Sequence, residues 1–261
     1  MDHLYLSWSL SMKFNKITLL LLIALLAFNR SIAQNIGNPI SAQGAKKWTL
    51  SASSNYSNIE IDNQKMIVKK HLAKASYGIG SQLDLFLLGG ASQLKMKYHT
   101  IDYTDDYRFT YGAGFQWELL QDTPQSPIEI WINMQAIRFQ SQFSFTITSS
   151  LVSQSLWRNY LDYDWREVNG TIGMSFVLNH MKIYGGGIGW LLQRIDKKSE
   201  FWNDQWWGPY KTTFQSGFWY GAAGGIEIKF PSEYKICVEA MALNRTNYQI
   251  MIGISQSRLY H

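Results

Sequence analysis

Residues 107–119 alternate between apolar and polar side chains with a period of two. The odd positions carry Tyr, Phe, Tyr, Ala, Phe, Trp and Leu, whereas the even positions carry Arg, Thr, Gly, Gly, Gln and Glu. Successive side chains of a β-strand point to opposite faces, so the pattern predicts a strand with one oily and one polar face. These 13 residues make a strand longer than average and long enough to cross a lipid bilayer.

The same alternation recurs in two further stretches of the chain. In 214–230, Phe, Ile, Tyr and Ala occupy even positions, whereas Gln, Trp, Gly, Glu and Lys occupy odd positions. In 168–178, Val, Ile, Met, Phe and Leu oppose Asn, Thr, Gly and Ser. Recurrence of long two-faced segments predicts a sheet in which many strands present an apolar row to lipid.

Ten strands follow from a pass along the whole chain. We predict them at 48–61, 66–80, 84–98, 107–119, 128–145, 163–178, 181–195, 213–230, 234–243 and 247–255. The fifth of these loses its alternation around 136–138, which we interpret as a β-bulge. Gly185 to Gly189 continue into an apolar strand pattern, so we interpret these glycines as strand residues that let a small barrel curve rather than as a phosphate loop.

The connections alternate between short and long. Short ones are predicted near 81, 121–127, 179 and 231–233, and longer ones near 99–106, 149–162 and 196–212. Lipid offers no hydrogen-bond partner to a sheet edge, so a lipid-facing sheet has to close on itself. The fold class we predict is all-β, a closed antiparallel up-and-down transmembrane β-barrel of about 10 strands, with 8 or 12 as alternatives.

The N-terminus has the features of an export signal. Lys13 and Lys16 precede the apolar run 17–28, and Ser31-Ile32-Ala33 supplies small residues for cleavage after position 33. Met12 is an alternative start to Met1. We therefore predict a signal peptide at 1–33, a periplasmic N-terminal segment at 34–47 and the barrel at 48–261. The chain has one cysteine, Cys237, so the sequence predicts no disulfide framework.

Tyr-Gly and Gly-x-Gly steps recur within the predicted strands, at 77–80, 111–114, 184–186 and 220–221. In these steps the chain resembles the small outer-membrane β-barrel proteins of Gram-negative bacteria. The resemblance implies an outer-membrane location with both termini in the periplasm, contact with outer-membrane lipids and lipopolysaccharide, and insertion by the barrel-insertion machinery. It implies no activity.

Composition agrees with a membrane barrel and excludes a nucleic-acid partner. Aromatic residues make up 15% of the chain and charged residues only 16%, whereas charged residues approach about 25% in soluble domains. Removing the leader takes three of the 24 basic and one of the 19 acidic residues, which leaves a net charge of +3. That charge is too small for a nucleic-acid-binding footprint.

Charged residues on the predicted inner faces form the first candidate site: Lys95, Lys97, Arg108, Glu118, Glu129, Glu227, Lys229 and Glu239. A 10-stranded barrel is only slightly wider than the 8-stranded kind that side chains fill. We therefore expect opposite charges to pair and plug the lumen. The alternative is a narrow ion- or solute-selective pore lined by the same groups.

Aromatic residues in two predicted outer loops form the second candidate site: Trp157, Trp165, Trp202, Trp206, Trp207 and Tyr210. Trp and Tyr favour membrane interfaces, so an aromatic girdle accounts for them. The alternative is a mouth that binds a glycan or small solute by stacking.

A catalytic role has weaker support. His99 lies near Asp102, Asp105 and Asp106, which is the combination that an outer-membrane hydrolase needs at its rim. Like-charged neighbours in a solvated loop are the default interpretation of these residues, because the Asp-His pairing of the outer-membrane proteases is absent. We predict no enzyme activity, no cofactor and no metal site. Our hypothesis is a monomeric barrel with a structural, binding or limited-permeation role. The competing architecture is an exported soluble lipocalin-like barrel, in which the oily faces would point inward.

Overall fold

A computed structural model describes residues 46–61, 64–98, 101–121, 123, 126–149, 155–202, 205–206, 211–231, 234–244 and 246–258. The predicted signal peptide at 1–33 and His99 lie outside these residues. No helix within the described ranges has the length and apolar character needed to cross a membrane.

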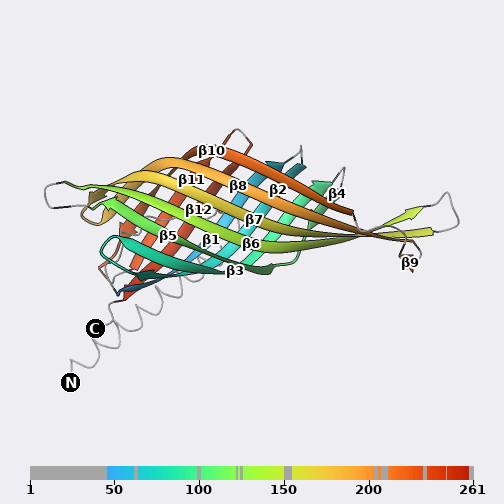
Figure 1. Cartoon of the computed structure of the whole chain (residues 1–261), viewed down its shortest axis with the longest axis horizontal. Helices are drawn as coiled ribbons and strands as arrows, with labels where there is room; N and C mark the ends of the chain where they lie inside the picture. Colours follow the sequence, from blue (N-terminus) through green and yellow to red (C-terminus); the bar gives the residue numbers. More distant parts are fainter. Residues whose placement is uncertain are drawn as a thin grey trace, which may run out of the picture. The chain divides into compact units, whose positions relative to one another are not determined.

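The described residues form a closed antiparallel barrel of ten strands (Figure 1). They are β1 (Trp48–Ile61), β2 (Gln64–Gly78), β3 (Leu83–Tyr98), β5 (Arg108–Leu120), β6 (Ile128–Ser149), β7 (Ser155–Leu178), β8 (Met181–Trp202), β10 (Lys211–Lys229), β11 (Tyr234–Ala242) and β12 (Tyr248–Arg258). Each strand pairs with the next, and β12 pairs with β1 to close the cylinder. The short strands β4 (Ile101–Thr104) and β9 (Gln205–Trp206) pair with β3 and β8. The predicted fold class and strand number are confirmed.

The two ends of the barrel differ in their connections. One end, called the turn end here, carries the connections at 79–82, 121–127, 179–180 and 230–233, and β1 begins and β12 ends there. The opposite end, called the loop end, carries the connections that join β3 to β5, β6 to β7 and β8 to β10.

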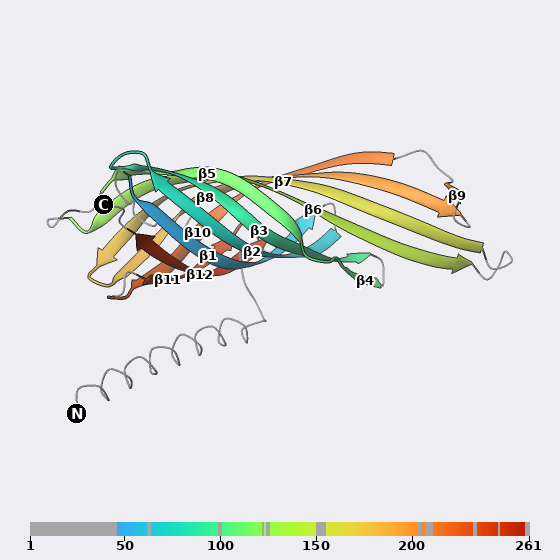
Figure 2. The same ribbon diagram turned by 90° about the horizontal axis from the view of Figure 1, so that it is seen from below.

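At the loop end, strands β6, β7, β8 and β10 continue well beyond the rest of the barrel (Figure 2). Strands β6, β7 and β8 contain 22, 24 and 22 residues, whereas β11 and β12 contain 9 and 11. One row of cross-strand partners runs Arg138, Arg166, Gln193 and Ser216. The loop-end extension is defined as this row and everything beyond it: 138–149, 155–166, 193–202 and 211–216. The predicted long loops at 149–162 and 196–212 are therefore wrong in large part, because strand pairing continues through most of their residues.

The outer face of the barrel near the turn end is apolar. Phe109, Leu87 and Phe218 expose 72%, 68% and 67% of their surface, whereas Glu227 exposes 3%. Other exposed large apolar side chains on this face are Leu50, Leu85, Met134, Ile172, Met174, Phe176, Ile183, Ile226, Ile228, Val238 and Ile250. The oily rows of the three alternating segments thus face outward, which is the reverse of the arrangement that a soluble lipocalin-like barrel requires.

In the loop-end extension the two faces exchange character. On β6, Met134 is exposed and Gln135 is buried, but further along the strand Phe139 is buried and Gln140 is exposed. The β5 to β6 and β6 to β7 registers run through 136–138 without a shift, so the predicted bulge there is wrong. The alternation was lost in the sequence because the faces swap polarity at this point while the backbone keeps its phase. The irregularity in the β5 to β6 register lies instead between Glu118 and Leu120.

Glycines on the inner wall make room for aromatic rings. A Cβ atom on Gly173 would lie 2.5 Å from the Trp131 ring, and one on Gly225 would lie 2.6 Å from the Tyr184 hydroxyl. Side chains at these positions would displace the rings, so the glycines let large aromatics fill a narrow cylinder. Residues 185–189 lie within β8, as the strand interpretation of this glycine run predicts.

Candidate functional site

The interior of the barrel near the turn end contains paired charges. Lys182 Nζ lies 2.7 Å from Glu129 Oε2, and Lys235 Nζ lies 3.2 Å from Glu227 Oε1. The Tyr184 hydroxyl donates a 2.7 Å hydrogen bond to Glu239 Oε2. All these carboxylates are buried. Lys182 and Glu129 lie on β8 and β6, two strands apart, and Tyr184 and Glu239 lie on β8 and β11, also two strands apart. Lys235 and Glu227 lie on the neighbouring strands β11 and β10, so these contacts run along the inner wall of the barrel.

A second charged layer lies nearer the middle of the barrel. Lys70 Nζ donates to both carboxylate oxygens of Glu167, at 2.5 and 2.6 Å, and both side chains are fully buried. The ammonium group also lies 4.8 Å from the centre of the Phe139 ring. Lys74, two inward positions closer to the turn end, is buried with its ammonium group 4.9 Å from the Phe86 ring.

An apolar layer closes the barrel towards the loop end. Buried side chains from seven strands, and Leu243 just after β11, meet there: Ile59, Ile61, Met66, Val68, Leu94, Met96, Phe139, Phe143, Tyr163, Trp165, Ile188, Trp190, Leu192, Met241 and Leu243. The rings of Phe139 and Trp165 stack with centroids 5.5 Å apart and planes 3° from parallel. Among the described residues, an apolar layer therefore lies between the paired charges and the loop end.

Arg194 is buried on the loop-end side of that apolar layer. Its guanidinium carbon lies 4.9 Å from the Tyr163 ring and 5.4 Å from the Trp165 ring. Its Nε and Nη2 atoms donate to Asp196 at 2.6 and 2.8 Å, and Nη2 also donates to Gln64 at 3.1 Å. Because Gln64 belongs to β2 and Arg194 to β8, this residue links opposite walls of the barrel.

The structure places the predicted lumen charges in four locations. Glu118, Glu129, Glu227 and Glu239 are buried in the interior. Lys95 and Lys97 lie on the outer face, because the buried neighbours on β3 are Leu94 and Met96; their predicted inward orientation is wrong. The reason is the exchange of faces at the loop end. Lys229 is exposed at the end of β10, at the turn end.

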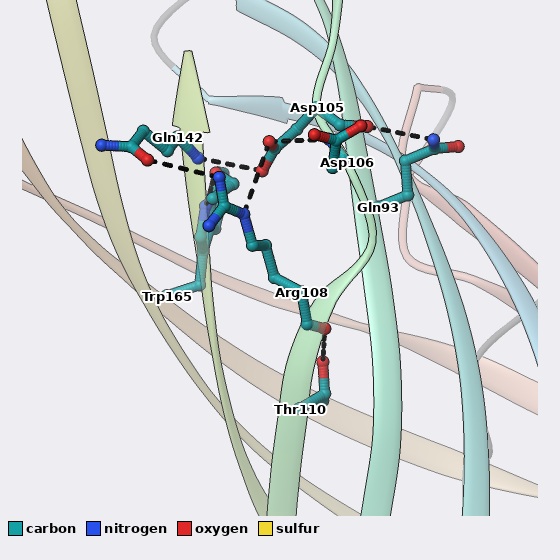
Figure 3. A network of polar contacts seen from close by, with 8 residues as sticks. Gln93, Asp105, Asp106, Arg108, Thr110, Gln142 and Trp165 are labelled. Atoms are coloured by element: carbon teal, nitrogen blue, oxygen red, sulfur yellow. Dashed lines mark hydrogen bonds and ion pairs between the residues drawn. The ribbon is translucent and has the colours of Figure 1, made fainter.

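Arg108 lies at the rim of the loop end in a polar network (Figure 3). Its Nε atom lies 3.7 Å from Asp105 Oδ1, and its Nη2 atom donates to Gln142 Oε1 at 3.2 Å. Asp105 in turn accepts hydrogen bonds from the backbone N–H groups of Gln142, at 2.9 Å, and Asp106, at 2.7 Å. Burial raises the pKa of the Asp105 carboxyl group, and these two hydrogen bonds oppose the rise. The network attaches the 105–107 connection to strand β6.

Two of the three carboxylates considered for a hydrolase at this rim are engaged in ion pairs. Asp102 pairs with Lys95 at 3.3 Å, and Asp105 pairs with Arg108. Within the described part of the chain, no three His, Cys, Asp or Glu side chains are grouped as a metal site would need.

The predicted loop aromatics are mostly strand residues. Trp165 lies on β7 with its ring fully buried, and its indole N–H donates to Ser141 Oγ at 3.2 Å; its placement in an outer loop is wrong. Trp157, Trp202 and Trp206 belong to β7, β8 and β9, while Trp207 and Tyr210 lie outside the described residues.

On the outer face, an ion cluster marks the beginning of the loop-end extension. Arg138 and Arg166 are direct cross-strand partners, and Asp164 bridges them. Arg138 donates to both carboxylate oxygens of Asp164 at 2.8 and 3.0 Å, and Arg166 donates at 3.3 Å. The preceding row of outward partners is Ala136, Val168, Leu191 and Phe218, which is entirely apolar. One step along the strands therefore separates an apolar surface from a charged one.

Several site residues were missed from the sequence, namely Lys70, Lys74, Glu167, Lys182, Arg194 and Lys235. Lys70 and Lys74 could be found from the sequence because they occupy even-numbered positions of β2. The apolar, inward-facing residues Met66, Val68 and Leu72 occupy the same set of positions. A lysine in phase with a buried row has to be paired or stacked inside.

No family model matches this chain, and no curated protein sequence matches it. Among solved structures, it is similar to the translocator domain of the autotransporter NalP from Neisseria meningitidis, with 11% identity, a TM-score of 0.49, and 83% of this chain and 90% of that one covered. It is also similar to the outer membrane protease OmpT from Escherichia coli, with 9% identity, a TM-score of 0.40, and 81% of this chain and 95% of that one covered. A third similar structure is the outer membrane protein OprG from Pseudomonas aeruginosa, with 14% identity, a TM-score of 0.37, and 83% of this chain and 98% of that one covered.

These similarities concern the barrel alone. With identities of 14% or less and TM-scores below 0.5, they assign neither a family nor an activity to this chain. Its own coordinates establish a closed ten-stranded antiparallel β-barrel with an apolar outer band and a packed interior.

Proposed function

We propose that this chain spans the outer membrane of a Gram-negative cell as a closed, non-conducting barrel that holds the loop-end extension outside the membrane as a binding surface. The observation that carries the proposal is the exchange of faces along single unbroken strands. On β6 and β7 the outward side chains change from Met134 and Ile172 to Arg138 and Arg166, while the inward ones change from Gln135 and Asn169 to Phe139 and Trp165.

The exchange of faces is explained if hydrocarbon surrounds one part of the barrel and water surrounds the other. Where hydrocarbon surrounds a barrel, apolar side chains face outward and polar ones pair inside; where water surrounds it, the order reverses. An apolar outer surface of this extent is far larger than a soluble monomer tolerates. The change between the Ala136 row and the Arg138 row then marks the outer membrane surface.

The interior supports a binding role over permeation. Paired charges near the turn end, the Lys70 and Glu167 layer and the stacked aromatic layer lie in series along the axis. An ion would have to break buried ion pairs and then cross an apolar layer, both of which cost far more than thermal energy. The proposal is one of binding rather than catalysis.

The orientation follows from the termini and the connections. β1 begins and β12 ends at the turn end, and outer-membrane barrels have short turns on the periplasmic side. We therefore place the turn end in the periplasm and the loop-end extension at the cell surface, where outer-membrane lipids and lipopolysaccharide surround the Arg138 row.

A thiol-labelling experiment tests this topology. The variants are Ser144→Cys in the loop-end extension and Ser81→Cys in the turn that joins β2 to β3, both at exposed positions. A maleimide that cannot cross membranes should label S144C on intact cells, and should label S81C only after the cells are lysed. The native Cys237 is buried, exposing 3% of its surface, so the unmodified chain serves as the background control. Labelling of S81C on intact cells would contradict the orientation, and release of the chain from membranes by salt without detergent would contradict the membrane location.

A further inference from the structure

The edge of β6 has no strand partner in the loop-end extension. Strand β5 pairs with β6 only as far as Phe139, whereas β7 pairs with β6 to Ser149. Among the described residues, therefore, 140–149 make strand pairs on one side only. Unpaired backbone groups on such an edge form a template for another strand.

This edge lacks the features that usually prevent strand addition. Residues 140–149 read Gln-Ser-Gln-Phe-Ser-Phe-Thr-Ile-Thr-Ser and contain no charged residue, proline or glycine. Natural edge strands are protected by lysine, proline, bulges or short length. The opposite edge of the extension, on β10, begins with Lys211. The unprotected edge is therefore specific to β6.

The Asp105 contact shows which backbone groups are available. The Gln142 N–H donates to Asp105, which lies on the side away from β7, so this N–H points to the open edge. Backbone groups alternate in direction along a strand, so the N–H and C=O groups of Ser144, Thr146 and Thr148 point the same way. Asp105 occupies the first of these positions, and among the described residues no strand pairs with the next three on this side.

The segment is also chemically palindromic around Phe145. Ser144 matches Thr146, Phe143 matches Ile147, Gln142 matches Thr148, and Ser141 matches Ser149. When two copies pair antiparallel about this centre, hydroxyl residues face hydroxyl residues and Phe faces Ile, which are favourable cross-strand pairs. The register also agrees with the hydrogen bonds, because Ser144 and Thr146, both directed to the open edge, become direct partners.

We propose that β6 pairs with β6 of a second copy of this chain through residues 143–147. The inference rests on the proposed function, because it requires the loop-end extension to lie outside the membrane. A two-fold axis that relates antiparallel strands is perpendicular to them, so the two barrels point in opposite directions. The two copies therefore sit in facing membranes, and the contact joins one membrane to another.

The test uses the full-length chain in two populations of phosphatidylcholine vesicles, one with a donor and one with an acceptor fluorescent lipid, and measures energy transfer when they are mixed. We expect transfer several-fold above that of protein-free vesicles. Thr146→Pro removes an open-edge N–H without removing a hydrogen bond to β7, so it should reduce transfer to the protein-free level. Thr146→Val keeps the N–H group and serves as the matched control that retains docking.

Charge variants separate self-pairing from other partners. S144K/T146K and S144E/T146E each place like charges opposite each other in the proposed register, so neither should dock with vesicles of its own kind. Mixing vesicles of the first with vesicles of the second should restore docking, because opposite charges then face each other. Docking that survives T146P, or failure of the mixed population to recover, would overturn the proposal. An unchanged circular dichroism spectrum shows that each variant is folded.

Failure of this proposal differs visibly from failure of the proposed function. If S144C is labelled on the outside of the vesicles but wild-type vesicles do not dock, self-pairing is wrong and the topology stands. If S144C is not labelled while S81C is, the topology itself is wrong. Docking of wild-type vesicles only after another protein is added would assign the edge to a different partner and would overturn self-pairing.

Discussion

At the scale of single residues, the most demanding contact is the ion pair between Lys70 and Glu167. Both side chains are fully buried, and one ammonium group serves both carboxylate oxygens. Two buried charges gain little net stability from each other, because most of their attraction is spent on leaving water. A single charge left behind in the same place is strongly destabilising. Losing one of the two charges should therefore destabilise the barrel more than losing both.

Removing one partner should be worse than removing both. We expect Lys70→Met to lower the free energy of unfolding by about 3–5 kcal/mol, and the double variant K70M/E167M to recover most of that loss. Lys95→Met is the control, because its partner Asp102 is exposed and such pairs contribute about 0–1 kcal/mol. Urea unfolding in detergent micelles measures all three. A double variant no more stable than K70M would show that the single loss is not due to the unpaired charge.

At the scale of one element, β6 combines two kinds of strand in 22 residues. From Ile128 to Ala136 its outward side chains are apolar, and from Arg138 onward they are polar. No bulge or turn marks the change, because the backbone register to β7 is continuous. The two halves of β6 therefore share the same strand pairing with β7 but lie in different environments.

The same substitution should therefore have different costs at two outward positions of β6. Met134→Arg places a charge in the apolar band, and we expect it to cost about 2 kcal/mol in vesicles. Gln140→Arg lies on the same face beyond the Arg138 row, and we expect a change within about 0.5 kcal/mol. Urea-induced unfolding in lipid vesicles compares them. Equal costs at both positions would place the membrane surface somewhere other than between the Ala136 and Arg138 rows.

At the scale of the whole molecule, the barrel is a filled cylinder. Charged, mixed and aromatic layers follow one another from the turn end to the loop end, and each is formed by strands from several sides of the wall. Closing the cylinder places residues that are far apart in sequence in direct contact, as Lys70 and Glu167 show.

A filled cylinder should not conduct. We expect the purified chain in planar lipid bilayers to give no current steps above the background of the bare membrane, because no water-filled path crosses the stacked layers. A general porin inserted in the same bilayers serves as the positive control. Regular steps that depend on protein concentration would instead support the narrow-pore alternative, lined by Glu129, Glu227 and Glu239.

Several features of this protein follow from the sequence alone. The period of two over long segments determined the strand class, the number of strands and which side chains of 107–119, 168–178 and 214–230 face outward. These features are local, because alternate side chains of any strand point to opposite faces. The inward positions of Glu118, Glu129, Glu227 and Glu239 follow from the same rule.

Other features required the tertiary structure. The pairing of Lys70 with Glu167, the stacking of Arg194 on Trp165 and the free edge of β6 depend on which strands become neighbours and on how far each one extends. The inner or outer position of Lys95 and Lys97 required it too, because an apolar row faces lipid in one half of a strand and the packed interior in the other. A sequence pattern records that two faces differ, but only the closed barrel and its surroundings decide which face is inside.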